Sequence, residues 1–192
     1  MASTGGSADQ DVIDVLTEDH REVRELANQI SASSDADERR DLTDQLIAEL
    51  VRHSVAEEMY VYPALRDHLP DGDQAVEHDT EEHRELEALM KQLESADAGT
   101  TEFEGALRQL QQVLVDHVQD EETEQFPQLR AHLPAATLVE LKEKVEHAKR
   151  LAPTRPHPAA PNAELFHKLV GPGVGLVDRL RDKLTDRSTE RS

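Results

Sequence analysis

The stretch HSVAEEMYVYPALRDHLP, residues 53–70, occurs twice in this chain. Residues 117–134 read HVQDEETEQFPQLRAHLP, and the two segments align at an offset of 64 residues. The aligned pairs are His53 with His117, Glu57 with Glu121, Glu58 with Glu122, and Pro63 with Pro127. Internal repeats of this length define the architecture before any local assignment is made.

A second repeated segment precedes each copy. EDHREVREL (18–26) recurs as EEHRELEAL (81–89), which aligns His20 with His83 at an offset of 63 residues. The chain therefore contains two copies of one unit: a helix with a single inward-facing His, then a helix with His and Glu one turn apart.

Composition limits the classes of function. The 192 residues include 41 Asp and Glu against 21 Lys and Arg, a net charge of −20, which disfavours binding to nucleic acid or anionic membranes. No Cys is present, so a metal site must use His and carboxylate ligands. Residues 1–10 lack an apolar core and no apolar run reaches membrane-spanning length, so we expect a cytoplasmic protein.

Apolar residues recur at helical spacing in four stretches, beginning near Asp11, after the loop 31–37, after the turn 69–73, and after the loop 95–101. The second and fourth stretches should kink or end near Pro63 and Pro127. Short connections between four amphipathic helices predict an all-α, up-down-up-down four-helix bundle.

The predicted organisation has three parts. Residues 11–151 form the bundle, with a peripheral fifth helix over 133–152. Residues 1–10 form a disordered N-terminus. Residues 152–192 form a Pro-rich extended segment followed by a short amphipathic helix over 173–184.

The His/Glu pairs suggest a metal site. Positions four apart share one helical face, so His53 with Glu57, and His117 with Glu121, present an imidazole and a carboxylate to one interior point. Such a pair alone is typical of a solvated helix face. Here both pairs continue a leucine stripe, and a buried carboxylate requires a compensating positive charge. No Lys or Arg occurs on these stripes at that level, so a metal cation is the natural compensation.

The lone His20 and His83 occupy matching places and face these pairs. A single His on an apolar face is more often a hydrogen-bonded core residue, but two matching ones favour ligands. Four His and two Glu predict a site for two metal ions with bridging carboxylates, suited to iron, manganese or zinc.

Four further residues are weaker candidates, for additional ligands or groups around the ligands: His78, Asp79, Tyr60 and Glu124. Tyr60 and Glu124 each lie seven residues after a second-helix His, so both are expected to point inward. Either they form an asymmetric edge of the metal site, or Tyr60 fills core volume while Glu124 reaches water.

The doubled pattern His…His-x-x-x-Glu, with EE-x-x-x-(Tyr/Phe)-Pro at each pair, resembles the hemerythrin-like (HHE cation-binding) family over residues 11–134. The tail, APTRPHPAAPN and then GPGVGLVDRLRDKL, is similar to the C-terminal extension of actinobacterial members. The resemblance implies a non-haem centre of two iron ions, bridged by an oxo or hydroxo group. Its terminal ligands would be His20, His53, His83 and His117, and its bridging ligands Glu57 and Glu121.

The chain departs from the invertebrate oxygen carriers of that family. Those proteins have a fifth His at the place of Asp79, and their last carboxylate follows its His by five residues rather than four. The loss of a strong ligand favours reactivity with small molecules over oxygen carriage.

Four functions are consistent with these residues. They are a di-iron protein that binds, senses or reacts with O2, NO or peroxide; a catalase-like enzyme that removes peroxide; an iron-buffering protein; and a zinc-binding or metal-free structural bundle. The oligomeric state is open.

Overall fold

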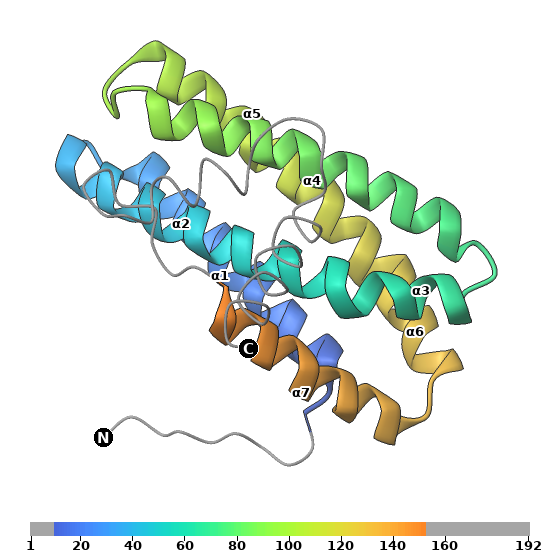
Figure 1. Cartoon of the computed structure of the whole chain (residues 1–192). Helices are drawn as coiled ribbons and strands as arrows, with labels where there is room; N and C mark the ends of the chain where they lie inside the picture. Colours follow the sequence, from blue (N-terminus) through green and yellow to red (C-terminus); the bar gives the residue numbers. More distant parts are fainter. Residues whose placement is uncertain (1–9, 153–192) are drawn as a thin grey trace, which may run out of the picture.

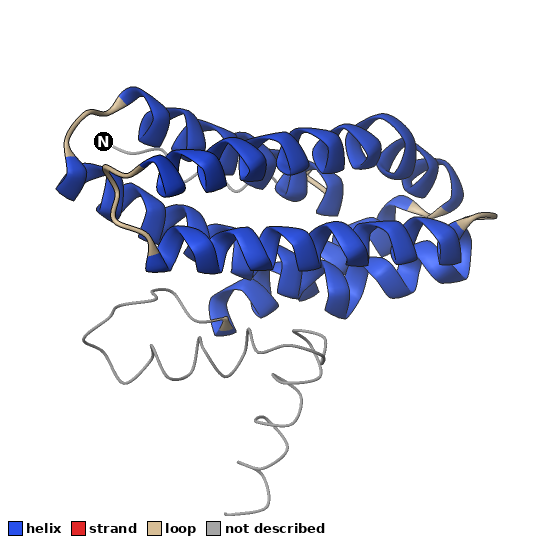
Figure 2. Ribbon diagram, turned by 90° about the horizontal axis from the view of Figure 1, so that it is seen from above, coloured by secondary structure: helices blue, strands red, loops and turns tan. Residues whose placement is uncertain are grey.

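The computed structural model describes residues 10–152, so the predictions for residues 1–9 and 153–192 lie outside the described residues. The helical elements are α1 (Val12–Ala32), α2 (Ala36–Ala56), η1 (Glu57–Val61), α3 (Tyr62–His68), α4 (Gly72–Ser95), α5 (Thr101–Asp120), η2 (Glu121–Gln125), α6 (Phe126–His132) and α7 (Ala135–Leu151). Between residues 10 and 152 the chain contains no strand (Figure 2). The predicted all-α class is confirmed.

Four long helical rods form the bundle: α1, the run α2–η1–α3, α4, and the run α5–η2–α6 (Figure 1). Sequential rods lie side by side, with α1 against α2 and α4 against α5. The fifth helix, α7, packs against α1 and α2, which places it on the side formed by the first copy of the repeat. This peripheral position agrees with the prediction.

Capping residues fix the start of α1. The Asp11 side chain accepts hydrogen bonds from the backbone N–H groups of Ile13 and Asp14, and the Asp14 side chain accepts one from the Asp11 N–H. This reciprocal capping box satisfies donors that the first helical turn leaves unpaired. Arg130 of α6 donates to both carboxylates, so the cap also ties α1 to the last rod of the bundle.

Both His/Glu rods contain a π turn. In η1 the Tyr62 N–H donates to the Glu57 carbonyl, and in η2 the Phe126 N–H donates to the Glu121 carbonyl, each five residues back. Pro63 and Pro127 follow directly and lack the N–H of the regular ladder, so the rods widen just before each proline. Helical structure continues to His68 and His132, so each proline marks a change of helix type rather than an end.

Each π turn adds one residue and rotates the face that follows. Beyond Glu57 the buried residues are Val61, Tyr62, Leu65 and Leu69, and beyond Glu121 they are Gln125, Phe126, Leu129 and Leu133. An uninterrupted α-helix would have turned positions 60 and 124 inward instead.

A layer of buried polar residues divides the core. One apolar cluster includes Ile30, Leu50 and Phe103, and the other includes Leu16, Leu65 and Phe126. On each of the four rods a buried His occurs at the boundary between the two clusters. The fold therefore gathers four imidazoles into one cross-section of the bundle.

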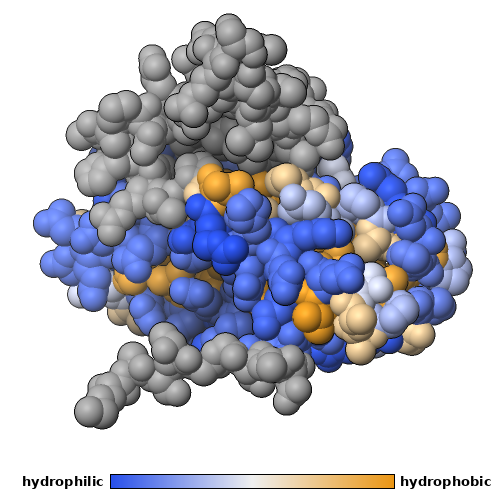
Figure 3. Space-filling model, turned by 60° about the horizontal axis from the view of Figure 1, so that its bottom comes forward, coloured by the Kyte–Doolittle hydropathy of each residue, from blue (hydrophilic) through white to orange (hydrophobic). Residues whose placement is uncertain are grey.

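The surface seen in Figure 3 is mainly hydrophilic, with apolar groups in separate islands. Among the described residues, the exposed large apolar side chains are Val115, Val139 and Leu151. No helix within residues 10–152 combines the length and the apolar character needed to cross a membrane.

Candidate metal centre

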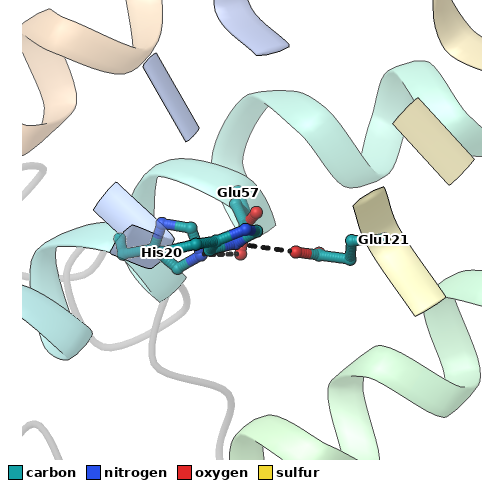
Figure 4. Close-up of side chains that lie close together, drawn as sticks. His20, Glu57 and Glu121 are labelled. Carbon is teal, nitrogen blue, oxygen red and sulfur yellow. Dashed lines mark hydrogen bonds and ion pairs between the residues drawn. The ribbon is translucent and has the colours of Figure 1, made fainter. Parts of the chain in front are cut away.

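The six residues predicted as ligands come together in the polar layer. His20 and His53 form one pair, with ring centroids 4.8 Å apart, and His83 and His117 form the other, at 4.9 Å. Glu57 and Glu121 lie between the pairs, and Figure 4 shows both carboxylates converging with the His20 imidazole. All six side chains are buried.

Each glutamate joins one imidazole from each copy of the repeat. Glu57 Oε2 lies 3.0 Å from His53 Nε2 and 3.4 Å from His83 Nε2. Glu121 Oε2 lies 3.1 Å from His20 Nε2 and 3.6 Å from His117 Nε2. All four rings thus direct Nε2 toward the centre. This donor set places two imidazoles on each side of two shared carboxylates, and its residues form groups that could hold a metal ion.

Unsatisfied atoms support the same interpretation. Both carboxylate oxygens of Glu57, both of Glu121 and the Nε2 atom of His117 are buried and take part in no hydrogen bond of good geometry. The glutamate oxygens lie within ion-pair distance of imidazole nitrogens, but these contacts do not have hydrogen-bond geometry. Burying such atoms without a partner is costly. A divalent cation would satisfy them, because carboxylate oxygen and imidazole nitrogen can coordinate the same ion. The residues therefore fit a metal centre.

An outer ring of carboxylates orients the imidazoles through their Nδ1 atoms. Asp19 lies 3.4 Å from His53 Nδ1, and Glu82 lies 2.9 Å from His117 Nδ1. Glu122 lies 2.9 Å from His20 Nδ1, and Glu58 lies 3.5 Å from His83 Nδ1. A carboxylate on Nδ1 fixes the tautomer that leaves the Nε2 lone pair free for a metal, and it raises ligand basicity.

The carboxylates of the cluster favour positive charge on the neighbouring imidazoles. Burial alone would lower the pKa of His53, but Glu57 and Asp19 overcome it and raise that pKa to about 10. The pKa of His83 is likewise raised to about 10, against its burial, by Glu57 and Glu58. Burial raises the pKa of Glu57, but His53 and His83 outweigh this and hold it well below its usual value. A metal ion bound here would replace imidazole protons as the compensating charge.

The two ends of the centre differ in their aromatic neighbours. Phe126 stacks on His20, with ring centroids 5.7 Å apart and an interplanar angle of 7°. The residue aligned with Phe126 is Tyr62, which stacks on His83 at 5.5 Å. Its hydroxyl lies 3.1 and 3.2 Å from the two ring nitrogens of His83. Burial and the nearby carboxylates, Glu57 first, raise the pKa of Tyr62 well above 10, so it remains a phenol.

Two of the weaker candidates do not occupy the predicted place. Tyr60 is half-buried and packs against the apolar cluster of Leu65, and Glu124 is exposed. Of the two alternatives, these positions agree with the second, in which Tyr60 fills core volume and Glu124 reaches water, because the π turn rotates the helix between Glu57 or Glu121 and these positions. The phenol that contacts the cluster is Tyr62.

The other two candidates, Asp79 and His78, differ in burial. Asp79 is fully buried, and its Oδ1 accepts a hydrogen bond of 2.8 Å from Gln125 Nε2. Burial and the charge of Glu121 raise its pKa to about 7. His78 is largely exposed and lies 3.4 Å from both Glu82 and Asp120, so it is outside the six-residue cluster.

Sequence reasoning missed several residues around the centre. Asp19 and Glu82 each precede a lone His, and this repeated acidic position was an available signal. Gln125 lies next to Phe126 on the rotated face. Lys149 of α7 pairs with Asp19 on the outer side of the first copy, a contact that no periodicity indicates.

Comparison with known proteins gives consistent matches. The family model described as the hemerythrin HHE cation binding domain matches residues 11–129. A hemerythrin-like protein of Schizosaccharomyces pombe is 31% identical over 174 residues, covering 90% of this chain and 86% of that protein. A DNA nickase of Nostoc is 32% identical over 134 residues, covering 69% of this chain but only 38% of the nickase.

One solved structure shares the fold. It is a hemerythrin HHE cation binding domain-containing protein from Mycobacterium kansasii, with a TM-score of 0.65 and 24% identity. The match covers 88% of this chain and 99% of that one.

Proposed function

The chain belongs to the hemerythrin HHE cation-binding family, and from that premise we propose that it is a non-haem di-iron protein that binds or reacts with O2, NO or peroxide. One observation carries the proposal. Four imidazoles direct Nε2 at two carboxylates that each join both copies of the repeat, and all four carboxylate oxygens are buried without a hydrogen bond.

In this proposal His20 and His53 hold one ion, His83 and His117 hold the other, and Glu57 and Glu121 bridge them. Bound iron would supply redox chemistry toward small oxygen- or nitrogen-containing molecules. The chain supplies orientation through the Nδ1 carboxylates, and two apolar clusters that exclude water from the layer between them. We do not extend DNA nicking to this chain, because a net charge of −20 opposes contact with phosphates and most of the nickase lies beyond the match.

Metal analysis of the purified protein tests the proposal, together with its ultraviolet-visible spectrum. We expect two iron ions per chain and an absorption in the near ultraviolet, whereas zinc would be silent. Glu57→Ala and Glu121→Ala should each lose at least one ion, and Glu124→Ala, an exposed carboxylate in η2, should lose none. Wild-type metal content in both ligand variants would refute the assignment.

A further inference from the structure

A second group of metal-ligating side chains lies outside the six-residue cluster, where α4 packs against α5. It consists of His78 and Glu82 of α4 and Asp120, the last residue of α5. His78 Nε2 lies 3.4 Å from Glu82 Oε1 and 3.4 Å from Asp120 Oδ2. Two donor atoms that bind one ion at about 2.0–2.2 Å and at a tetrahedral angle are separated by about 3.3–3.6 Å. Both measured distances therefore match the spacing within one coordination shell.

Glu82 connects this surface group with the buried centre. Its Oε1 atom faces His78, and its Oε2 atom lies 2.9 Å from His117 Nδ1. Glu82 and His117 also form a possible donor group with Asp79, and His117 belongs to the buried cluster itself. Side-chain exposure falls along this series, from 57% at His78 through 13% at Glu82 to 1% at His117. Donor groups that share a residue thus extend from the surface to the buried centre.

Asp79, which lies between Glu82 and the centre, has a free ligand atom. Its side chain is fully buried, and its Oδ2 atom has no hydrogen-bond partner. One ligand atom from each of Asp79, Glu82 and His117 lies within 4.8 Å of the others. An oxygen that is buried and unpaired costs about 1–3 kcal/mol. This oxygen would give an incoming cation a further contact one step inside Glu82.

The corresponding place in the first copy carries no such group. At the three aligned positions the first copy has one acid and two apolar residues: Asp19, Val15 and Ala56. Asp19, the counterpart of Glu82, pairs with Lys149 of α7, a helix that packs on α1 and α2. A fixed ammonium group opposes a metal ion at that carboxylate, and the two apolar side chains offer no ligand. The side of the bundle that carries surface ligands is thus that of the second copy.

We propose that His78, Glu82 and Asp120 form an exposed site for a divalent cation, and that metal enters the buried centre through it. One imidazole and two carboxylates suit iron, manganese and zinc. The net charge of −20 raises the concentration of cations near the protein. Glu82 and Asp79 receive the ion from the surface group and pass it inward. The entry role rests on the proposed function, whereas cation binding at the surface does not.

The rate of metal loading tests the entry role. The chelator-treated full chain is mixed with Fe²⁺ in air, and stopped-flow absorbance follows the near-ultraviolet band. His78→Ala and Asp120→Asn should each slow loading at least roughly tenfold, since loss of even an outer partner of a ligand costs about 10–100-fold in metal affinity. Both should reach the wild-type spectrum in the end, because neither residue belongs to the buried cluster. Asp116→Asn removes the same charge one turn earlier on α5 and should load at the wild-type rate.

Zinc binding tests the surface site directly. Calorimetric titration of the iron-loaded chain with Zn²⁺ should show one more ion per chain in wild type than in His78→Ala. His147→Ala, which removes an exposed His of α7, should match wild type.

The possible failures are distinguishable. Equal zinc stoichiometry in wild type and His78→Ala overturns the surface site. A wild-type loading rate in His78→Ala, or equal slowing in Asp116→Asn, overturns the entry role. A wild-type protein that binds no iron refutes the proposed function and with it the entry role, and the zinc comparison, made then on the protein as purified, still decides the surface site.

Discussion

Replacing Glu57 by Gln should destabilise the metal-free protein, although it removes a buried carboxylate. The reason is His53, whose pKa is raised to about 10 largely because Glu57 lies 3.0 Å away, in spite of its burial. Without that charge the pKa of His53 falls, although Asp19 keeps part of the shift. The full shift is worth about 3 pH units at pH 7, or about 4 kcal/mol, and the variant should lose the part that Glu57 supplies. At about 2–4 °C per kcal/mol, the melting temperature should fall by several degrees, with about 8–16 °C as the upper bound.

The pH dependence tests the cause. The folded-state pKa of His53 is raised above its unfolded value of 6.5, so the stabilisation is fully present below pH 6.5 and is lost as pH rises through about 10. The difference in melting temperature between chelator-treated wild type and Glu57→Gln should follow that course. Glu124→Gln, an exposed change of the same kind, should stay within about 0.5 kcal/mol of wild type. A variant as stable as wild type at pH 7, or a difference independent of pH, would refute this reasoning.

Three other expectations can be checked by thermal unfolding. Metal removal by a chelator should lower the free energy of unfolding by about 2.7 kcal/mol for each site, if the free metal had been at 100 times its dissociation constant. This corresponds to a fall of about 5–10 °C in melting temperature. Equal melting temperatures with and without chelator would contradict a buried centre. Gly72→Ala should destabilise by about 1–3 kcal/mol or more, because its Cβ would lie 2.1 Å from the Leu65 carbonyl oxygen, whereas Gly105→Ala meets nothing within 4 Å and should stabilise by about 0.5–1 kcal/mol. The same sign for both would contradict the packing at Gly72. Arg130→Ala should cost about 1 kcal/mol at pH 7. Burial alone would raise the pKa of Asp11, but the hydrogen bond from Arg130 outweighs burial and lowers it. The cost of Arg130→Ala should therefore disappear as pH falls below about 4 and Asp11 is protonated. A cost that persists in acid would exclude the ion pair as its cause.

Periodicity predicted which six side chains come together, because the helices are regular up to them. His53 and Glu57, like His117 and Glu121, are one α-helical turn apart, and the α form holds until the glutamate itself. The lone His residues lie within the uninterrupted α1 and α4. Repeat and helical spacing were therefore sufficient for all six positions, and for the bundle that brings them together.

The same reasoning failed one turn later. A π turn follows each glutamate, and neither hydrophobic spacing nor the following proline fixes where the extra residue is inserted. Tyr62 rather than Tyr60 consequently points into the core. The aligned aromatic pair Tyr62 and Phe126 was a visible signal, since matching aromatics at an offset of 64 favour a shared buried role. The Nδ1 carboxylates are a different case: Asp19 of α1 reaches His53 of α2, a contact that depends on helix packing rather than on spacing within one helix.

The π turns also explain why the polar side of the centre draws on both copies. They begin at Glu57 and Glu121 and carry the next aromatic residue toward the lone His of the other copy, Tyr62 onto His83 and Phe126 onto His20. A tyrosine in the first copy therefore acts on the same half of the centre as Asp79 and Gln125 of the second. Tyr62, Asp79 and Gln125 thus lie on the side of His83 and His117, whereas Phe126 stacks on His20 and Leu16 and Val61 belong to an apolar cluster. Since each glutamate also joins one imidazole from each copy, neither copy by itself supplies the contacts of the cluster, which form only when both copies fold together.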